Sequence, residues 1–397
     1  MKLISFQAAI GQLLGHGTKM RATELVSLET SVGRVLATDI RATTDNPAFT
    51  NSAVDGYAVF HEDDLCKNAT FVVKTVSAAG GAPTTTRFSK GEAMRVFTGA
   101  PLPKECVGVH MQEDITADSQ ANGFRVTAKA KVGQHIRNRA TEFAKGTKLA
   151  KAGTVINPGL IALLASQGFS NLKCRKKPSV IILSTGDELV PVNKKPGPGQ
   201  IRNSTAPMLS AIVEQLGGKV TKTLHVRDNL SRITAALKQA AENAQLVLIS
   251  GGASVGDHDH AVAAVQALGK LCFHGVSMKP GKPVAAGKIG KCCVICLPGN
   301  SASAFVCAHL FVDAALVSIV DHRPNSPGWT PVTMRSKYKT GAREEFVRCN
   351  LTSGEATIVG EQASFGTVSL AEANCIVAIP ANTTVKPGDK LRAWLTQ

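Results

Sequence analysis

Between residues 179 and 320, short apolar runs alternate with longer segments of helical spacing, and this alternation limits the possible folds more than any other feature. The apolar runs predict strands at residues 180–183, 220–226, 246–250 and 293–297. The segments of helical spacing predict helices at residues 207–216, 230–243, 260–268 and 302–320. Strands that alternate with helices form βαβ crossovers, so we expect an α/β domain with a mostly parallel sheet and helices on both faces.

The sequence on either side of this α/β region has a different pattern. Residues 3–14 have helical spacing, and residues 23–35 predict a short loop and helix that lead to a strand. Short apolar runs between Gly and Pro turns predict a β-rich insert with strands at 57–60, 71–76, 93–97 and 124–128. We therefore expect a multidomain α/β plus β protein with a scaffold region (1–45 and 139–177), the β-rich insert (46–138), the α/β domain (178–323) and a C-terminal β-rich domain (327–397).

The chain is strongly basic. It has 45 Lys and Arg residues against 29 Asp and Glu residues, which gives a net charge of +16 and favours a polyanionic partner. The excess is spread over both halves of the chain, and the two Trp and two Tyr residues offer few platforms for stacking bases. We therefore expect a small anionic ligand and no nucleic-acid partner.

Several features predict a cytoplasmic protein. The ten cysteines do not follow the spacing of a zinc site, and we expect them to be reduced and packed. The N-terminus lacks the apolar core of a signal peptide. The apolar stretch 302–320 carries His309 and Asp313, so it predicts a buried helix and no membrane partner.

Polar and glycine-rich segments follow the predicted strands of the α/β region. They are Ser184–Glu188, Arg227–Asp228, Ser250–Asp259 and Pro298–Ser301. Ligands of open α/β sheets bind beyond the carboxyl ends of the strands, and glycines there let the backbone approach phosphate oxygens closely. These loops predict a site for a polyanion or a nucleotide. The turn Lys279–Pro283 displays two lysines and fits either an anion-binding turn or a solvated turn.

The glycine-rich loop after the third strand admits other interpretations. Residues 252–256 fit the nucleophile elbow of a hydrolase, with Ser254 as the nucleophile. The residues that would complete a triad, Asp313 and His322, lie on or beside a predicted helix, which disfavours a hydrolase. Asp259 fits either one ligand of a metal ion or the N-cap of the next helix.

Seven segments, in this order, resemble the molybdopterin molybdenumtransferase family, the MoeA-like proteins that include the E domain of gephyrin. The segments are Asn51–Tyr57 (NSAVDGY), Thr98–Pro103 (TGAPLP), Met111–Asp114 (MQED), Ser184–Leu189 (STGDEL), Ser250–Asp259 (SGGASVGDHD), Lys279–Pro283 (KPGKP) and Pro298–Asn300 (PGN). The resemblance covers nearly the whole chain. It implies a scaffold region, an inserted β-rich domain, a molybdopterin-binding α/β domain and a C-terminal β-barrel-like domain. It also implies a homodimer with a cleft shared between subunits, in which Asp55 and Thr98 face the partner subunit's loops.

The resemblance further implies a reaction, the Mg²⁺-dependent insertion of molybdate into the dithiolene of adenylylated molybdopterin with release of AMP. Such chemistry needs positioning and charge neutralisation rather than a side-chain nucleophile, which suits these loops. The residues expected to act in catalysis are Asp55, Glu188, Asp228 and Asp259, and the last three are the expected Mg²⁺ ligands. The expected substrate-binding residues are Thr98, Ser184, Thr185, Gly186, Asp187, Gly251, Gly252, Ser254, Gly256, Lys279, Pro280, Gly281, Lys282, Pro298, Gly299, Asn300, Ser301, Arg348 and Ser369.

Two positions depart from the family pattern. Glu142 stands where the family commonly has Asp, and Ser301 stands where it commonly has Pro. If these changes abolished turnover, the chain would be a non-catalytic scaffold that binds molybdopterin or a nucleotide, and this is the alternative function. The expected partners are a second copy of the chain, the pterin nucleotide and molybdate, and other proteins of cofactor biosynthesis.

Overall fold

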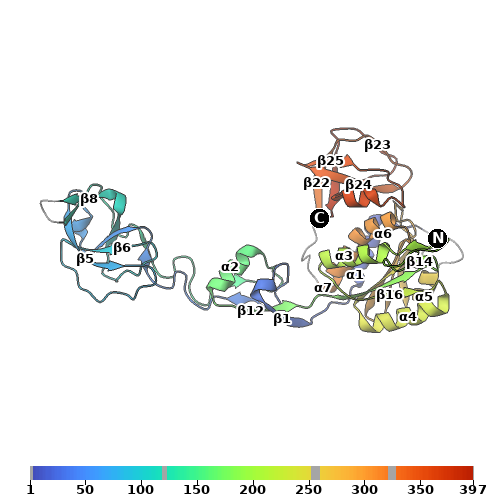
Figure 1. Ribbon diagram of the computed structural model, residues 1–397, viewed down its shortest axis with the longest axis horizontal. Helices are drawn as coiled ribbons and strands as arrows, with labels where there is room; N and C mark the ends of the chain where they lie inside the picture. Colours follow the sequence, from blue (N-terminus) through green and yellow to red (C-terminus); the bar gives the residue numbers. More distant parts are fainter. Residues whose placement is uncertain (1–2, 119–122, 252–259, 321–327, 397) are drawn as a thin grey trace. The chain divides into compact units, whose positions relative to one another are not determined.

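The computed structural model describes residues 3–118, 123–251, 260–320 and 328–396. These residues form two compact units, whose elements Figure 1 shows in sequence colours. Unit 1 comprises the described parts of residues 1–37, 155–157 and 171–397, and unit 2 comprises those of residues 38–154 and 158–170.

The α/β sheet of unit 1 has the strand order β16-β13-β17-β21-β20-β18 within the described residues. Its strands are β13 (Ser179–Thr185), β16 (Lys219–Val226), β17 (Leu246–Ser250), β18 (Lys270–His274), β20 (Ala285–Ile289) and β21 (Cys292–Leu297). The first four strands in this spatial order are parallel. At one edge β20 runs in the opposite direction, and β18 pairs antiparallel with β20, so β18 again runs in the direction of the first four. The mostly parallel sheet is confirmed, but the sequence patterns did not predict β18 and β20, which pair antiparallel at its edge.

Helices cover both faces of this sheet, as predicted (Figure 1). They are α1 (Phe6–His16), α3 (Thr205–Gln215), α4 (Leu230–Asn243), α5 (His260–Leu268), α6 (Ser301–Cys307), the π-helical segment η4 (Ala308–Val312) and α7 (Asp313–Val320). On one face, α4 and α5 bury Leu237 and Val265 against the sheet. On the other face, the remaining helices pack against residues such as Ile182 and Leu248. Both faces are therefore apolar, which leaves the carboxyl ends of the strands as the polar edge.

The helical stretch Ser301–Val320 runs continuously from α6 through η4 to α7. Its length and composition would allow it to cross a membrane, but 89% of its most apolar window is buried inside the protein. Phe311 of this stretch packs edge-on against Phe6 of α1, with ring centroids 5.8 Å apart. The stretch is a core helix, as the sequence predicts.

The C-terminal part of unit 1 contains a small closed barrel. Its strands are β22 (Trp329–Met334), β24 (Glu344–Thr352), β25 (Glu355–Ile358), β26 (Cys375–Ile379) and β28 (Lys390–Leu395). Because β24 pairs with both β25 and β26, the order β24-β25-β22-β28-β26 closes on itself. The predicted β-barrel-like C-terminal domain is confirmed.

The barrel, helix α1 and the α/β domain share one hydrophobic core. Phe6 of α1 packs against Phe346 of β24 and Trp329 of β22, with ring centroids 4.7 and 6.4 Å apart. Short elements complete this region: β19 (Met278–Lys279), which pairs with β24, then β23 (Tyr338–Lys339), α8 (Val368–Glu372) and β27 (Thr384–Val385). The shared core holds the barrel in contact with the helices that cover the sheet.

The expectation of a loop and helix at residues 23–35 is wrong. Thr23–Ser27 forms strand β1, which pairs antiparallel with β12 (Asn171–Arg175), and only Leu28–Thr30 forms a 3-10 turn, η1. The partner strand lies far along the chain, so local spacing carried no signal of this pairing.

Unit 2 contains the β-rich insert, whose sheet has the strand order β7-β4-β6-β5-β9-β8 within the described residues. These strands are β4 (Gly56–Val59), β5 (Thr70–Ser77), β6 (Glu92–Val96), β7 (Gly108–Met111), β8 (Ile115–Asp118) and β9 (Gly123–Val126). The other elements of unit 2 are β2 (Ile40–Arg41), β3 (Asn51–Ser52), η2 (Glu62–Leu65), η3 (Gln112–Asp114), β10 (Ile136–Arg137), β11 (Lys148–Ala150) and α2 (Pro158–Ser166). Two apolar clusters, which include Met94 and Phe71, fill the interior of the insert. The predicted β-rich insert is confirmed.

Candidate functional site

The carboxyl ends of β13, β17 and β21 meet at one edge of the α/β sheet, where the loops surround a cavity of about 350 Å³. The described residues that line this cavity are Thr185, Gly186, Glu188, Leu189, Ile201, Arg202, Asn203, Ser204, Thr205, Asp228, Ser250, Gly251, Gly299, Asn300 and Ser301. The residues of this set that the sequence singled out are Thr185, Gly186, Glu188, Asp228, Gly251, Gly299, Asn300 and Ser301. Most lining groups are hydroxyls, carboxylates, amides or glycine backbone, which suits a charged ligand.

Gly186 leaves the space that the Glu188 carboxylate occupies. Its φ is +141°, and a Cβ at this position would lie 2.6 Å from a carboxylate oxygen of Glu188. The carboxylate therefore folds back over Gly186, in space that no side chain at residue 186 could share. The Nε2–H group of His225 donates a hydrogen bond to the Gly186 carbonyl at 2.9 Å, which holds this turn in place. Glu188 is thereby presented to the cavity.

Asp228 is tied to the neighbouring loop by two hydrogen bonds. The Thr185 hydroxyl donates to Oδ1 of Asp228 at 3.2 Å, and the Asp228 N–H donates to Oδ1 of Asp187 at 3.4 Å. Asp187 therefore supports the loop, while Asp228 and Glu188 both line the cavity. Two carboxylates beside the hydroxyls of Thr185 and Ser250 are a set of oxygen donors that fits a hard cation such as Mg²⁺.

Gly251 and Gly299 form a wall of the cavity from backbone alone. Gly251 has a φ of +92°, and a Cβ there would lie 2.3 Å from the Thr185 carbonyl oxygen. A Cβ on Gly299 would lie 3.5 Å from the Gly251 Cα. The two loops therefore approach each other in a way that requires glycine at residue 251. Next to this wall, Ser184 is buried, and its Oγ has no hydrogen-bond partner among the described residues.

The segment before α3 supplies part of the lining, and the sequence patterns did not predict it. Strands β14 (Leu189–Val190) and β15 (Ile201–Arg202) pair beside the cavity. The hydroxyls of Ser204 and Thr205 then hydrogen-bond with the Ser301 hydroxyl, at 3.2 and 3.0 Å. Ser301, which departs from the family pattern, thus joins a cluster of hydroxyls. The polar run Asn203-Ser204-Thr205 before a helix was a usable signal of this cluster.

Several predicted residues fall in segments without a described position. Gly252, Ser254, Gly256 and Asp259 lie outside the described residues, and their roles stay predictions. For the disfavoured hydrolase triad, Asp313 is buried in α7, while Ser254 and His322 are both outside the described part of the chain.

The Lys279–Pro283 turn contributes no residue to the described lining of the cavity. Lys279 Nζ instead forms an ion pair with Oε2 of Glu345 on β24, at 3.2 Å. Burial opposes the ionisation of Glu345, but the Gly341 N–H, the Tyr338 hydroxyl and Lys279 outweigh it, so the Glu345 pKa is lower than usual. The turn is thus fixed to the barrel by a charged contact. Substrate binding by Lys279, Pro280, Gly281 and Lys282, and by the buried Pro298, stays a prediction.

Arg348 and Ser369 lie inside the C-terminal part of unit 1. Arg348 is fully buried, and its Nε donates to the Ser369 hydroxyl at 3.0 Å. Its Nη2 donates to the carbonyls of Glu361 and Ala363, at 2.8 and 3.1 Å. Burial lowers the pKa of Arg348. Most N–H donors of the Arg348 guanidinium are therefore hydrogen-bonded to other atoms of the protein.

Asp55 and Thr98 are neighbours in unit 2. Oδ1 of Asp55 accepts hydrogen bonds from the Thr98 N–H and the Thr98 hydroxyl, at 2.7 and 2.8 Å. These two bonds, with Arg95 nearby, hold the pKa of Asp55 below its usual value. Asp55 is therefore an ionised and anchored carboxylate at neutral pH. In the same unit, the Glu142 carboxylate accepts a hydrogen bond from the Asn46 side chain.

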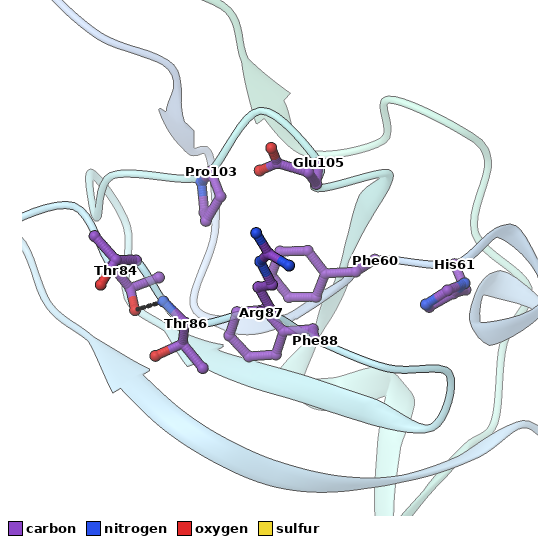
Figure 2. Close-up of a pocket in the computed structure, with 9 residues that line it drawn as sticks. Phe60, His61, Thr84, Thr86, Arg87, Phe88, Pro103 and Glu105 are labelled. Atoms are coloured by element: carbon purple, nitrogen blue, oxygen red, sulfur yellow. Dashed lines mark hydrogen bonds between the residues drawn. The ribbon is translucent and has the colours of Figure 1, made fainter.

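Unit 2 also contains a larger cavity, of about 670 Å³, which Figure 2 shows. Phe60 and Phe88 stack with ring centroids 3.9 Å apart, and the guanidinium of Arg87 lies beside these rings, with Glu105 nearby (Figure 2). Pro103, the last residue of the TGAPLP motif, lines this cavity. No predicted catalytic or substrate-binding residue is among its described lining, so this cavity has no part in the proposed chemistry.

In the described part of the chain, no three His, Cys, Asp or Glu side chains lie close enough together to hold a metal ion. Glu188 and Asp228 supply two carboxylates at the cavity, and the third predicted ligand, Asp259, is outside the described residues. All ten cysteines are free thiols, and burial raises the pKa of Cys292 and Cys293 to about 12. A protonated, buried thiol is a poor nucleophile and metal ligand, which agrees with the expectation of packed cysteines for these two. Cys66 departs from that expectation because it is exposed.

The family models that match the chain define a class of protein, multidomain proteins with a probable molybdopterin-binding domain. The family model described as a probable molybdopterin binding domain matches residues 181–317, which contain the sheet and its strand-end loops. The MoeA N-terminal region (domain I and II) matches residues 4–168, and the MoeA C-terminal region (domain IV) matches residues 331–395. The chain belongs to the MoeA family, a family of transferases that act in molybdenum cofactor biosynthesis.

Similar proteins cover nearly the whole chain. A molybdopterin molybdenumtransferase of Nostoc sp. is 33% identical over 380 residues, which are 91% of this chain and 86% of the relative. A molybdopterin molybdenumtransferase of Staphylococcus aureus is 31% identical over 404 residues, which cover 99% of this chain and 96% of the relative. The solved structure of a molybdopterin biosynthesis MoeA protein from Pyrococcus horikoshii OT3 is 28% identical, with a TM-score of 0.86 over 99% of this chain and 100% of that chain.

Proposed function

We propose that this chain is a molybdopterin molybdenumtransferase that inserts molybdate into the dithiolene of adenylylated molybdopterin, with Mg²⁺-dependent cleavage of the phosphoanhydride and release of AMP. The observation that carries this proposal is the strand-end cavity, into which Glu188 and Asp228 present carboxylates beside a wall of glycine backbone. The names of the curated relatives support the same activity.

The residues of the cavity suit an anionic substrate that must be held and oriented. Glu188 and Asp228 would hold Mg²⁺, with Asp259 as the third predicted ligand, and the bound ion would neutralise charge on the phosphates. The backbone at Gly251 and Gly299 lets a phosphate or the pterin approach closely. The hydroxyls around Ser301 can donate hydrogen bonds to phosphate oxygens.

Residues outside the described cavity complete the proposal. Lys279 and Lys282 neutralise phosphate or molybdate, while Arg348 and Ser369 act through the segment that they hold. Asp55 acts on the pterin or on proton transfer, in a cleft shared between the two subunits of a cytoplasmic homodimer. The anchored, ionised state of Asp55 supports its part in this scheme.

The test is an assay of AMP release and molybdenum incorporation with adenylylated molybdopterin, molybdate and Mg²⁺. We expect Glu188→Gln and Asp228→Asn each to lower the rate about 100-fold, because each loses one charge at the cavity. Asp259→Ala should have a similar effect. Glu355→Gln, which breaks an ion pair with Arg335 on the barrel, is the matched control and should keep the wild-type rate.

Two outcomes would contradict this proposal. Equal rates in the wild type and the carboxylate variants would exclude the assigned roles of Glu188 and Asp228. A wild-type protein that binds the pterin nucleotide but releases no AMP would be the non-catalytic scaffold of the same family.

A further inference from the structure

Arg348 clamps a short segment, residues 361–366, that lies beside the cavity. Besides the Nη2 bonds to Glu361 and Ala363, the backbone N–H of Arg348 donates to Oε1 of Gln362 at 2.8 Å. The Gln362 amide donates back to the Arg348 carbonyl at 3.1 Å. Ser369, the acceptor of Arg348 Nε, also donates to the Gly366 carbonyl at 3.3 Å. A buried charged residue therefore fixes this segment from one end to the other.

The clamped segment contacts the wall of the cavity through Ser364. The Asn300 side chain donates a hydrogen bond to the Ser364 hydroxyl at 3.2 Å, and the Ala302 N–H donates to the Ser364 carbonyl at 3.2 Å. Asn300 lines the cavity, and Ala302 is in the first turn of α6. The position of Ser364, and of the residue after it, is thus set relative to the substrate loops.

The residue after Ser364 is Phe365, whose exposed fraction is 74%. Val368, three residues further on, is 71% exposed. One exposed apolar side chain is ordinary, but Phe365 is fixed by its neighbours beside a ligand cavity, and a second exposed apolar residue follows it closely in sequence. On β15, Ile201 lines the cavity and is itself 57% exposed. Two segments near the polar cavity therefore carry exposed apolar side chains.

The chemistry of the cavity indicates what covers Phe365. The described lining holds carboxylates, hydroxyls, amides, glycine backbone, the side chain of Arg202 and two aliphatic side chains, but no aromatic side chain. Its volume of about 350 Å³ is at the lower end of the range of about 300–1,000 Å³ for drug-sized ligands. A pterin nucleotide is larger than most such ligands and carries two planar rings. One ring must therefore extend past the polar lining, where a rigid aromatic side chain can stack on it.

We propose that Phe365 is the stacking platform for a planar heteroaromatic ring of the substrate, and that Arg348 and Ser369 are positioning residues that hold this platform at the cavity. This inference rests on the proposed function and deepens it, because it names how the same site recognises the pterin nucleotide. The two rings available are adenine and the pterin, and separate probes distinguish them.

The experiment measures the equilibrium dissociation constants of AMP, molybdopterin and adenylylated molybdopterin for the full chain. Phe365→Ala should raise the constant for adenylylated molybdopterin about 5- to 100-fold, and Phe365→Tyr should keep it within about 2-fold, because a second aromatic ring preserves stacking. If AMP also binds Phe365→Ala more weakly, adenine is the stacked ring. If molybdopterin does so instead, the pterin is the stacked ring. Leu25→Ala removes a 77% exposed side chain on β1 and is the control for loss of exposed apolar area.

The positioning role is tested by a double-mutant cycle. Ser369→Ala removes the acceptor of the Arg348 Nε hydrogen bond. It should weaken binding of the same probe whose binding Phe365→Ala weakens. In the Phe365→Ala background, Ser369→Ala should have no further effect on that constant, since it acts through the ring. If Ser369 had a purely structural role, Ser369→Ala would lower the melting temperature. It would then either leave the dissociation constants unchanged or add its own effect to that of Phe365→Ala in the double variant. Ser369→Thr, which keeps the hydroxyl, should restore binding.

The outcomes separate this inference from the proposed function. Turnover by the wild type with unchanged constants in Phe365→Ala would overturn the stacking role alone. Unchanged constants with a changed oligomeric state would overturn it too, and would assign Phe365 to an interface between copies. Tight binding without AMP release, with weaker binding by Phe365→Ala, would support the platform while the proposed function fails. A wild type that neither binds nor turns over would overturn both.

Discussion

At the scale of single residues, the shape of the cavity depends on two glycines, because each leaves space that a Cβ would fill. Gly186 leaves room for the Glu188 carboxylate, and Gly251 allows its loop to touch the Thr185 carbonyl. Both glycines adopt positive φ angles. A Cβ at residue 251 would push the two loops apart, and a Cβ at residue 186 would displace the Glu188 carboxylate, although neither glycine donates a functional group.

Gly251→Ala should therefore impair the site more than the fold. The positive φ costs about 1–2 kcal/mol for any non-glycine residue, and the new Cβ would also meet the Thr185 carbonyl oxygen 2.3 Å away. We expect AMP release to fall at least about 10-fold, because displacement of positioning groups slows catalysis steeply. The measurements are AMP release and the free energy of unfolding.

The matched control for this prediction is Gly354→Ala. Gly354 has a similar φ of +83°, but a Cβ there would meet no atom within 4 Å. This variant should lose similar backbone stability and keep its rate. Equal rates in both variants would show that the contact at Gly251 is irrelevant to function.

The candidate site could be predicted only where glycine and acidic residues follow strands. Those local patterns were enough to indicate Gly186, Asp228 and Gly251. Ser204 and Thr205, which line the cavity themselves, were marked only by the polar run before a helix, and their hydrogen bonds to a serine about a hundred residues away leave no local pattern. The burial of Arg348 was equally invisible, because an isolated arginine in a strand gives no sign of which side chains surround it.

At the scale of elements, the stretch from α6 to α7 combines a core helix with a π-helical segment. The segment η4 carries His309, which is buried and packs edge-on against Phe305 with ring centroids 4.6 Å apart. Burial lowers the pKa of His309 to about 4, so its ring is neutral in the folded protein at pH 7.

This histidine should make the protein less stable in acid. Between about pH 6.5 and pH 4 the unfolded chain binds a proton that the folded chain does not, so the free energy of unfolding falls as the pH falls. We expect this group to account for up to about 3 kcal/mol of that loss at pH 4. Urea unfolding of wild type and His309→Gln from pH 7 to pH 4 measures it.

The His309→Gln variant should lose stability less steeply over this pH range, whatever its stability at pH 7. Leu25→Ala replaces an exposed side chain that carries no titratable group and should follow the wild-type pH dependence. Parallel curves for the wild type and His309→Gln would mean that His309 does not titrate as its burial implies.

The helices and parallel strands of the α/β domain were predictable because each repeats a pattern within its own residues. Strand β1 was mistaken for a loop and helix because its partner β12 lies far along the chain. Strands β18 and β20 were also missed. The KPGKP turn between them is typical of a binding loop, and its sequence does not indicate that the segments before and after it pair as strands. Pairing between distant segments is a property of the fold, and it leaves little trace in local spacing.

At the scale of the whole molecule, the predicted site residues are divided between two compact units. Asp55 and Thr98 belong to unit 2, while Glu188 and Asp228 belong to unit 1. If the proposed homodimer shares its clefts, each cleft takes these two groups from different subunits. Two inactive variants could then complement each other.

A mixture of Asp55→Asn and Asp228→Asn subunits, co-expressed in equal amounts, should recover about a quarter of the wild-type AMP release. Half of the dimers would be mixed, and each mixed dimer would contain one cleft with both wild-type residues. The rate of the purified mixture is compared with those of the separate variants. Activity no higher than that of the variants alone would place both residues in one subunit's site or exclude the shared cleft.

The edge strand of the α/β sheet has a consequence for handling the protein. Within the described residues β16 is the outermost strand on its side, so its backbone is open to pairing with another molecule. Lys219 and Lys222 are exposed on this strand, and the chain carries a net charge of +16. Two copies that approach edge to edge therefore repel each other in dilute buffer. Salt screens this repulsion, so aggregation should increase with ionic strength.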